Sequence, residues 1–297
     1  MTTRIATPGV YDMPAEDYHA DPCPLPSLSS SGARTMVNEC PATFWHERQN
    51  PQPKRVFEIG TAGHLMVLEP ELFAAKVRVI QGDDYRTNAA KEQRDAARAA
   101  GLTPLLAKEA QMVRDMRAVL WADPIASKAF EGGIAEQTLI WRDREFGIWR
   151  RARPDYSPPH RRYLVDYKTS TSADPEDFSK AMLNYGYHMQ AAWMLDAFEA
   201  VFGERPAKFC FVVQSKQPPY LVSVCWVDPE AIAIGATLNR YACGLFRWCL
   251  DHNEWPGFRD DITAPPRAFN VTLPGFAIKQ FEAAHEAGRY NPPEIAA

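Results

Sequence analysis

The sequence predicts an α/β fold in which helices flank a central mixed β-sheet. Three short runs rich in β-branched and aromatic residues, at 136–141, 147–153 and 163–169, follow a region of helical periodicity. A long apolar-periodic segment, starting at the helix-opening pair Asp174–Pro175, comes directly after them. The 297 residues are 46% apolar and 24% charged, which is typical of a globular protein and excludes wholesale disorder.

The pattern of residues 1–119 predicts an N-terminal arm followed by helices. Residues 1–27 are rich in proline near their end and are expected to form an extended arm. Serines at 29–31 can cap a short helix that runs through Val37. A second helical run follows Gly60 and stops at Pro70. Alternating charges at 88–119 predict two solvated helices that are separated near Gly101 and Pro104.

The later part of the chain alternates strands and helices. Charged or proline-bearing turns separate the first three strands, so they predict a three-stranded antiparallel meander. The helix after Asp174 is expected to break at Gly186 and to end at Gly203. Two more strands at 207–214 and 221–227 precede a helix that Asp228–Pro229 opens.

The domain organisation follows from these elements. We expect one domain over residues 1–264, with the core that would carry its chemistry at 135–228. Residues 265–297 are expected to form a proline-rich C-terminal tail.

Charge and composition limit the classes of function. Lysine and arginine total 33 against 37 acidic residues, a net charge of −4, so any surface for nucleic acid must be local. No apolar run is long enough to span a membrane and the N-terminus lacks a signal-peptide pattern, so a cytoplasmic protein is expected. The six cysteines contain no CxxC pair, which favours reduced and mostly buried thiols.

The residues that carry chemistry are Asp155, Asp166 and Lys168. Side chains alternate across a strand, so Asp166 and Lys168 share one face of the run at 163–169. Asp155 ends the preceding strand and can lie beside Asp166 across the hairpin. Two converging carboxylates predict a site for Mg²⁺, for which Mn²⁺ can substitute.

Such a site suits hydrolysis of a phosphodiester. A divalent cation activates water and neutralises charge on the phosphate. Lys168 would orient the attacking water and stabilise developing charge, or act as a base if desolvation lowers its pKa. A surface Asp–Lys pair is the alternative that a bare D-x-K pattern leaves open.

The pattern of RPD at 153–155 followed by DYKTS at 166–170 resembles the PD-(D/E)xK nuclease superfamily, which has a restriction-endonuclease-like core. Between residues 11 and 258 the chain also resembles RecE-type double-strand DNA exonucleases of prophage recombination systems. The matching segments, in order, are YDMPAEDYH at 11–19, LSSSG at 28–32, GTAGHLMVLEPE at 60–71, RTNAAKE at 86–92, YGYHMQAA at 185–192 and NEWP at 253–256.

The resemblance implies an active site and an activity. Asp155, Asp166 and His64 would hold the metal. The implied catalytic set, matched residue by residue, is Lys168, Asp155, Asp166, His64, Glu136, Gln190 and Tyr187. The resemblance also implies Mg²⁺-dependent, processive removal of 5′-terminated nucleotides from duplex ends, leaving 3′ single strands for an annealing protein. It further implies a ring-shaped homo-oligomer that encircles DNA.

Arginines crowd the region around this site and are candidate DNA contacts. Arg150, Arg151 and Arg153 belong to a local basic excess between residues 142 and 162, although Arg150 and Arg151 lie on opposite strand faces. Arg86 and Lys91 are further candidates.

Three alternatives share the nuclease core. One is the iron–sulfur relative that acts in CRISPR spacer acquisition, which requires a cluster of cysteines. Another is an endonuclease, which would also cut closed circles. The third is a protein that binds DNA ends in recombination without hydrolysing them.

Overall fold

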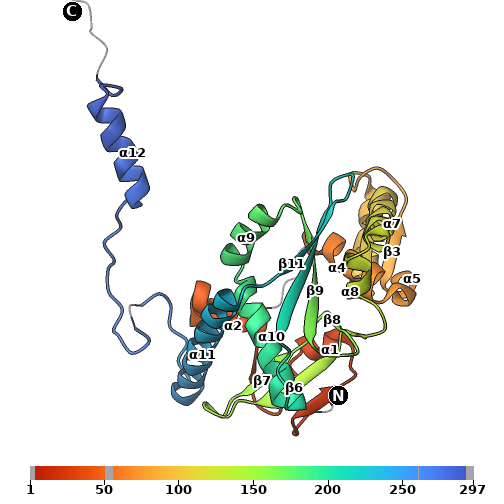
Figure 1. Ribbon diagram of the computed structural model, residues 1–297, viewed down its shortest axis with the longest axis horizontal. Helices are drawn as coiled ribbons and strands as arrows, with labels where there is room; N and C mark the ends of the chain where they lie inside the picture. The colour runs from red at the N-terminus through yellow and green to blue at the C-terminus, as the bar shows by residue number, and fades with distance from the viewer. Residues whose placement is uncertain (1–3, 51–55, 260, 292–297) are drawn as a thin grey trace, which may run out of the picture. The chain divides into compact units, whose positions relative to one another are not determined.

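The computed structural model describes residues 4–50, 56–259 and 261–291, and the chain divides into two compact units at residues 1–257 and 258–297 (Figure 1). The division therefore comes before the predicted boundary at 264. The second unit contains helix α12 (Gly275–Glu286), although the sequence there predicts only a proline-rich tail.

The first unit is built on three β-sheets. Its elements confirm the predicted α/β class. The largest sheet has the strand order β11 (Val222–Trp226), β10 (Lys208–Ser215), β9 (Tyr163–Ser170), β8 (Tyr156–Ser157) and β5 (Ile134–Ala135). A four-stranded sheet has the order β1 (Gly9–Tyr11), β6 (Thr138–Arg142), β7 (Trp149–Ala152) and β2 (Ser27–Ser29). The third sheet pairs β3 (Val77–Ile80) with β4 (Thr103–Leu106).

Helices cover these sheets (Figure 1). They are α1 (Ala15–His19), α2 (Ser30–Asn38), α3 (Pro41–Gln49), α4 (Val56–Leu68), α5 (Phe73–Lys76), α6 (Asn88–Ala99), α7 (Ala107–Ala122), α8 (Ala126–Ala129), α9 (Pro175–Asn184), α10 (Tyr187–Phe202) and α11 (Pro229–His252), with a 3₁₀ turn at Pro70–Leu72. Within the described ranges no helix combines the length and apolar character that crossing a membrane requires.

The central strand β9 is buried on both faces. It pairs in parallel with β10 and is covered on one face by an apolar cluster that includes Val67 of α4, Leu120 of α7 and Tyr167. Phe211 of β10 packs on the other face against Phe178 of α9, with ring centroids 5.2 Å apart. A strand buried on both faces needs apolar side chains on each, so a charged residue in β9 requires a partner.

Predicted helix boundaries agree well with the structure where a cap defines them. Ser29 accepts a hydrogen bond from the backbone N–H of Gly32 and begins α2. Asp174 and Asp228 cap α9 and α11 in the same way. Gly186 has φ +65 and separates α9 from α10, as expected of a residue that adopts the left-handed region.

The predicted three-stranded meander is wrong. Strands β6 and β7 pair in the four-stranded sheet, whereas β8 and β9 pair in the five-stranded sheet. The segments β5–β6 and β7–β8 run antiparallel to each other and form the two arms of a long hairpin. Each arm passes between the five-stranded sheet and the four-stranded one at neighbouring positions, between Ala135 and Thr138 in the first arm and between Ala152 and Tyr156 in the second.

Two other predictions near the N-terminus also need correction. The first 27 residues are not only an extended arm, because β1 pairs with β6, β2 begins at Ser27 beside β7, and α1 buries Tyr18. The helices at 88–119 are separated by strand β4, and α7 is not fully solvated because it buries Val113 and Leu120.

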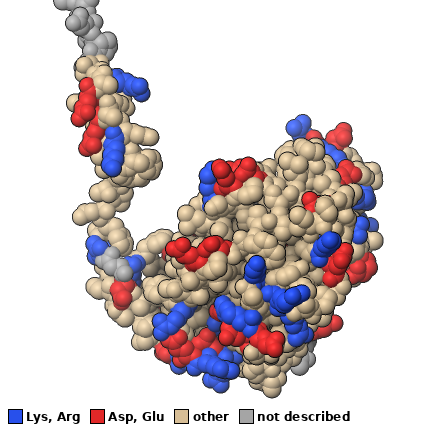
Figure 2. All heavy atoms as spheres, viewed as in Figure 1, with Lys and Arg blue, Asp and Glu red and all other residues tan. Residues whose placement is uncertain are grey.

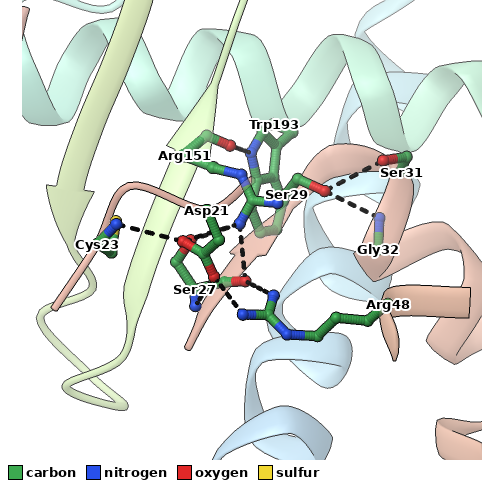
Figure 3. Close-up of polar contacts among 9 residues, drawn as sticks. All are labelled: Asp21, Cys23, Ser27, Ser29, Ser31, Gly32, Arg48, Arg151 and Trp193. Carbon is green, nitrogen blue, oxygen red and sulfur yellow. Dashed lines mark hydrogen bonds and ion pairs between the residues drawn. The ribbon is translucent and has the colours of Figure 1, made fainter. Parts of the chain in front are cut away.

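A buried ion cluster centred on Asp21 attaches the N-terminal segment to the rest of the unit (Figure 3). The Asp21 carboxylate accepts hydrogen bonds from the backbone and hydroxyl of Ser27 at 2.8 and 2.6 Å and from Arg48 of α3 at 2.6 Å. It also lies 3.4 Å from a guanidinium nitrogen of Arg151 on β7. The cluster thereby links one loop, one helix and one sheet.

We expect Asp21→Asn to lower the free energy of unfolding by about 3 kcal/mol, because removal of one partner leaves the buried charge of Arg151 poorly compensated. Urea unfolding at neutral pH measures the difference. Asp83→Asn at an exposed position is the control and should leave stability unchanged.

The stabilisation by Asp21 should depend on pH. Burial alone would raise the pKa of Asp21, but Arg151 and the hydrogen bonds from Ser27 hold it below its ordinary value of 3.8. The carboxylate therefore stabilises the fold above pH 3.8, and this contribution is lost as the pH falls through the lowered pKa. The gap in stability between the parent protein and Asp21→Asn should shrink on acidification, and a gap independent of pH would contradict this assignment.

Candidate metal centre

Two carboxylates meet where the chain changes from one sheet to the other. Glu136 lies between β5 and β6, Asp155 lies between β7 and β8, and the backbone N–H of Glu136 donates to the carbonyl of Asp155 at 3.0 Å. Glu136 has φ +53, a left-handed conformation that costs a non-glycine residue about 1–3 kcal/mol. The surrounding structure holds this strained residue beside Asp155.

The side chain of Asp155 accepts a hydrogen bond from β9 at a position where the backbone of β8 no longer pairs with it. Strand β8 pairs with β9 at Tyr156 and Val165, and then the two strands separate. The next backbone N–H on that edge of β9, from Tyr167, donates to Asp155 Oδ2 at 2.8 Å. The side chain of Asp155 therefore lies against β9 at Tyr167, the residue that follows Asp166.

Helix α4 brings His64 to the same place. A Cβ at Gly63 would lie 3.3 Å from Thr169 Cγ2, so the absence of a side chain there lets α4 lie close to β9. The His64 ring packs edge-on against Tyr167, with centroids 5.3 Å apart. Its Nδ1 lies 3.3 Å from Asp155 Oδ2.

His64, Glu136 and Asp155 each present one ligand atom, and these atoms all lie within 4.8 Å of one another. Across the described part of the chain, this is the one group of three or more His, Cys, Asp or Glu residues close enough to hold an ion. The three side chains keep 28%, 21% and 12% of their surface exposed, so an ion and a substrate can reach them from solvent.

The electrostatics of the group fit a divalent cation. Burial, and then the charge of Asp155, raise the pKa of Glu136 to about 8, and burial also raises the pKa of Asp155. These shifts reflect mainly the cost of holding a carboxylate away from water, to which repulsion by Asp155 adds at Glu136, and a cation would offset this cost. Burial, together with the Lys168 ammonium, lowers the pKa of His64 to about 4, so its ring is neutral at neutral pH. Two carboxylates and one neutral imidazole suit Mg²⁺ or Mn²⁺.

Asp166 and Lys168 lie on the face of β9 that α10 covers. Gln190 Nε2 donates to Asp166 Oδ2 at 2.5 Å, Lys168 forms an ion pair with Asp166, and the Tyr187 ring centroid lies 5.1 Å from Lys168 Nζ. Asp166 is therefore held by Gln190 and Lys168, and it lies outside the group of three potential ligands. The sequence predicts Asp155, Asp166 and His64 as ligands, whereas in the structure Glu136, and not Asp166, lies close to Asp155 and His64.

Lys168 remains an ammonium in this environment. Burial acts to lower its pKa, but Asp166 and Asp155 outweigh that effect and raise it. This direction favours the role of Lys168 in orienting water over the role of a base. The same crowding acts on Asp166, whose pKa burial and the charge of Asp155 raise to about 6.

Three of the predicted DNA contacts point into the protein. Arg150 stacks 3.9 Å from the Trp193 ring centroid, and Arg151 belongs to the Asp21 cluster. Arg153 donates to Glu136 Oε2 at 2.6 Å. Both faces of β7 are covered, so Arg150 and Arg151 are buried although they point in opposite directions. Arg153 follows β7, and its side chain is only 12% exposed because it pairs with Glu136.

The other two predicted contacts are on the surface. Arg86 has 91% of its side chain exposed and lies just before α6, while Lys91 is exposed in the first turns of that helix. Figure 2 shows basic and acidic side chains interleaved on the face drawn rather than a single basic surface. Arg86 and Lys91 stay predictions.

The sequence reasoning missed Arg34, which lies beside the centre. Its guanidinium carbon is 5.9 Å from the Tyr187 ring centroid, and Nη1 donates to the carbonyl of Tyr185 at 3.0 Å. The segment LSSSG was singled out, but the arginine two residues after it reaches the site only because α2 packs on α10.

A cleft of about 950 Å³ opens beside the same helices. Its lining includes Ser31 and Thr35 of α2 and Glu58 and Thr61 of α4. Thr61 is one turn before His64 in α4, but none of the three candidate ligands lines this cleft.

In this chain Asp155 directly precedes β8 of a mixed sheet whose strand β9 carries Asp166 and Lys168 in a D-x-K pattern. This arrangement defines a PD-(D/E)xK-type fold. Residues 29–262 match a family described as a PDDEXK-like domain of unknown function (DUF3799), and the chain belongs to this family.

A solved structure shares the fold. It is the crystal structure of a protein from Eubacterium rectale, provisionally named an exonuclease, with a TM-score of 0.58 and 12% sequence identity. The match covers 90% of this chain and 98% of that one. No curated protein matches the sequence. The restriction-endonuclease-like fold class and the PD-(D/E)xK superfamily are thereby confirmed.

We expect the centre to bind a divalent cation such as Mg²⁺ or Mn²⁺ through His64, Glu136 and Asp155. Asp155→Asn should weaken Mn²⁺ binding roughly 10- to 100-fold, because the loss of charge from a ligand reduces its hold on a hard cation. Calorimetric titration measures the affinity, with Glu131→Gln at an exposed position as the control. Equal affinities of Asp155→Asn and the parent protein would exclude this ligand assignment.

Proposed function

We propose that the protein is a divalent-metal-dependent exonuclease that removes 5′-terminated nucleotides from linear duplex DNA and leaves 3′ single strands. The observation that carries this proposal is the approach of His64, Glu136 and Asp155 within 4.8 Å, next to the Lys168–Asp166 pair. Membership of the PDDEXK-like family and the fold of the Eubacterium rectale protein support nuclease chemistry at this site.

Each side chain has a defined part in hydrolysis. His64, Glu136 and Asp155 would hold the cation, which when bound neutralises charge on the scissile phosphate and lowers the pKa of water. The Lys168 ammonium would orient the attacking water and stabilise the negative charge that develops on the phosphate.

Gln190 and Tyr187 act through these groups. Gln190 holds the Asp166 carboxylate, and Asp166 in turn fixes the position of the Lys168 ammonium. The Tyr187 ring covers the other side of that ammonium. An ammonium held between a carboxylate and a ring is positioned before the substrate arrives, which lowers the cost of orienting it.

The direction of digestion and the partners rest on the resemblance to RecE-type exonucleases. It supports Mg²⁺ as the natural ion, a ring-shaped homo-oligomer, and a single-strand annealing protein that receives the 3′ tails during recombination. The name of the Eubacterium rectale protein supports exonuclease over endonuclease activity.

Linear duplex DNA and closed circular DNA separate the exonuclease from its alternatives. With Mg²⁺ we expect mononucleotides from linear DNA, early release of a 5′ label, and intact circles. Cutting of circles would indicate an endonuclease, and a coloured protein with visible absorption would indicate the iron–sulfur relative.

Substitutions at the centre test the residues. Lys168→Ala and Asp166→Asn should each reduce nucleotide release at least about 100-fold without unfolding the protein, because the first removes the ammonium that stabilises the phosphate and the second no longer holds that ammonium in position. Lys208→Ala, at an exposed position on β10, is the control. Parent protein that binds DNA ends without releasing nucleotides would favour a non-catalytic end-binding role, and undiminished release in both variants would refute the site.

A further inference from the structure

Two strongly exposed apolar side chains lie at the rim of the candidate centre. Leu183 and Tyr185, at the C-terminal end of α9, have 73% and 62% of their surfaces exposed. Single exposed apolar residues are ordinary on protein surfaces. These two are distinguished by their position, because the chain turns at Gly186 and the next residue, Tyr187, contacts Lys168.

A short series of rings leads from the surface to the catalytic lysine. The Tyr185 and Tyr187 ring centroids are 5.6 Å apart, and the Tyr187 centroid is 5.1 Å from Lys168 Nζ. Only the Tyr187 ring therefore separates the exposed ring of Tyr185 from the ammonium. A nucleobase is joined to its phosphate through a single sugar, so a base near Tyr185 is compatible with a phosphate near Lys168.

The backbone that carries Tyr185 is held in place. Gly186 has φ +65, and a Cβ at that position would lie 3.1 Å from Cδ of Arg34. Arg34 Nη1 donates to the carbonyl of Tyr185 at 3.0 Å. The exposed ring is thus presented from a fixed turn, and Arg34 and Lys168 supply positive charge beside it for a phosphodiester backbone.

We propose that Tyr185 stacks on an unpaired nucleobase of the substrate strand, next to the phosphodiester bound at the centre. The inference rests on the proposed nuclease function and specifies how the strand is held. Every base has a π-face, so stacking on tyrosine is independent of sequence, as digestion of arbitrary DNA requires. Base–aromatic stacking contributes about 1–3 kcal/mol, which corresponds to a factor of roughly 5 to 150 in binding.

The test compares duplexes whose 5′-terminal nucleotides are either natural or abasic tetrahydrofuran residues. On natural ends Tyr185→Ala should lower kcat/KM by roughly 5- to 150-fold, while Tyr185→Phe retains most of the parent value. On abasic ends the parent protein should itself be slow, and Tyr185→Ala should add little to that loss because both changes remove the same interaction. Tyr241→Ala, 54% exposed on α11, is the matched control and should behave as the parent protein.

A binding measurement separates this inference from the proposed function. A strand with 2-aminopurine at the position predicted to stack should lose fluorescence on binding to the parent protein but not to Tyr185→Ala. Equal quenching by both proteins, or an equal loss of rate on natural and abasic ends, would overturn the stacking role. Quenching that depends on Tyr185 in a protein that releases no nucleotides would overturn the nuclease function and retain the stacking.

Discussion

The hydrogen bond from the Tyr167 backbone to the Asp155 carboxylate is the interaction on which the candidate site depends. Strand β8 leaves β9 immediately before this point, so a side chain replaces the backbone acceptor that the ladder would otherwise supply. The same departure brings Glu136 beside Asp155, because the two arms of the hairpin change sheets together. A break in a β-ladder thus places two largely buried carboxylates next to the central strand.

Burial of so much charge is unfavourable unless the charges compensate one another. Lys168 neutralises Asp166 on one face of β9, and Arg153 neutralises part of the charge of Glu136. Asp155 accepts a backbone N–H and lies beside the neutral ring of His64, and the charges of Lys168 and Arg153 compensate its own only in part. Burial raises the pKa of both Asp155 and Glu136, and the charge of Asp155 adds to the shift of Glu136, so a divalent cation would offset the cost of holding both as carboxylates.

Two helices complete the site from opposite faces of the strand. Helix α4 approaches closely because Gly63 has no side chain, and it supplies His64. Helix α10 begins at the Gly186 turn and supplies Tyr187 and Gln190 within its first two turns. That turn also presents Tyr185 to solvent, so the residues that hold Lys168 and the surface proposed to hold a base are positioned by one backbone feature.

The sequence by itself determined the features that depend on neighbouring residues in the chain. Strand alternation placed Asp166 and Lys168 on one face, and capping residues located the starts of α2, α9 and α11. Only the tertiary structure decided which side chains are buried and which segments meet. It covered both faces of β7, which turned Arg150 and Arg151 inward, and it divided the hairpin between two sheets, which brought Glu136 to Asp155. These outcomes depend on contacts between residues far apart in the chain, which neither periodicity nor spacing encodes.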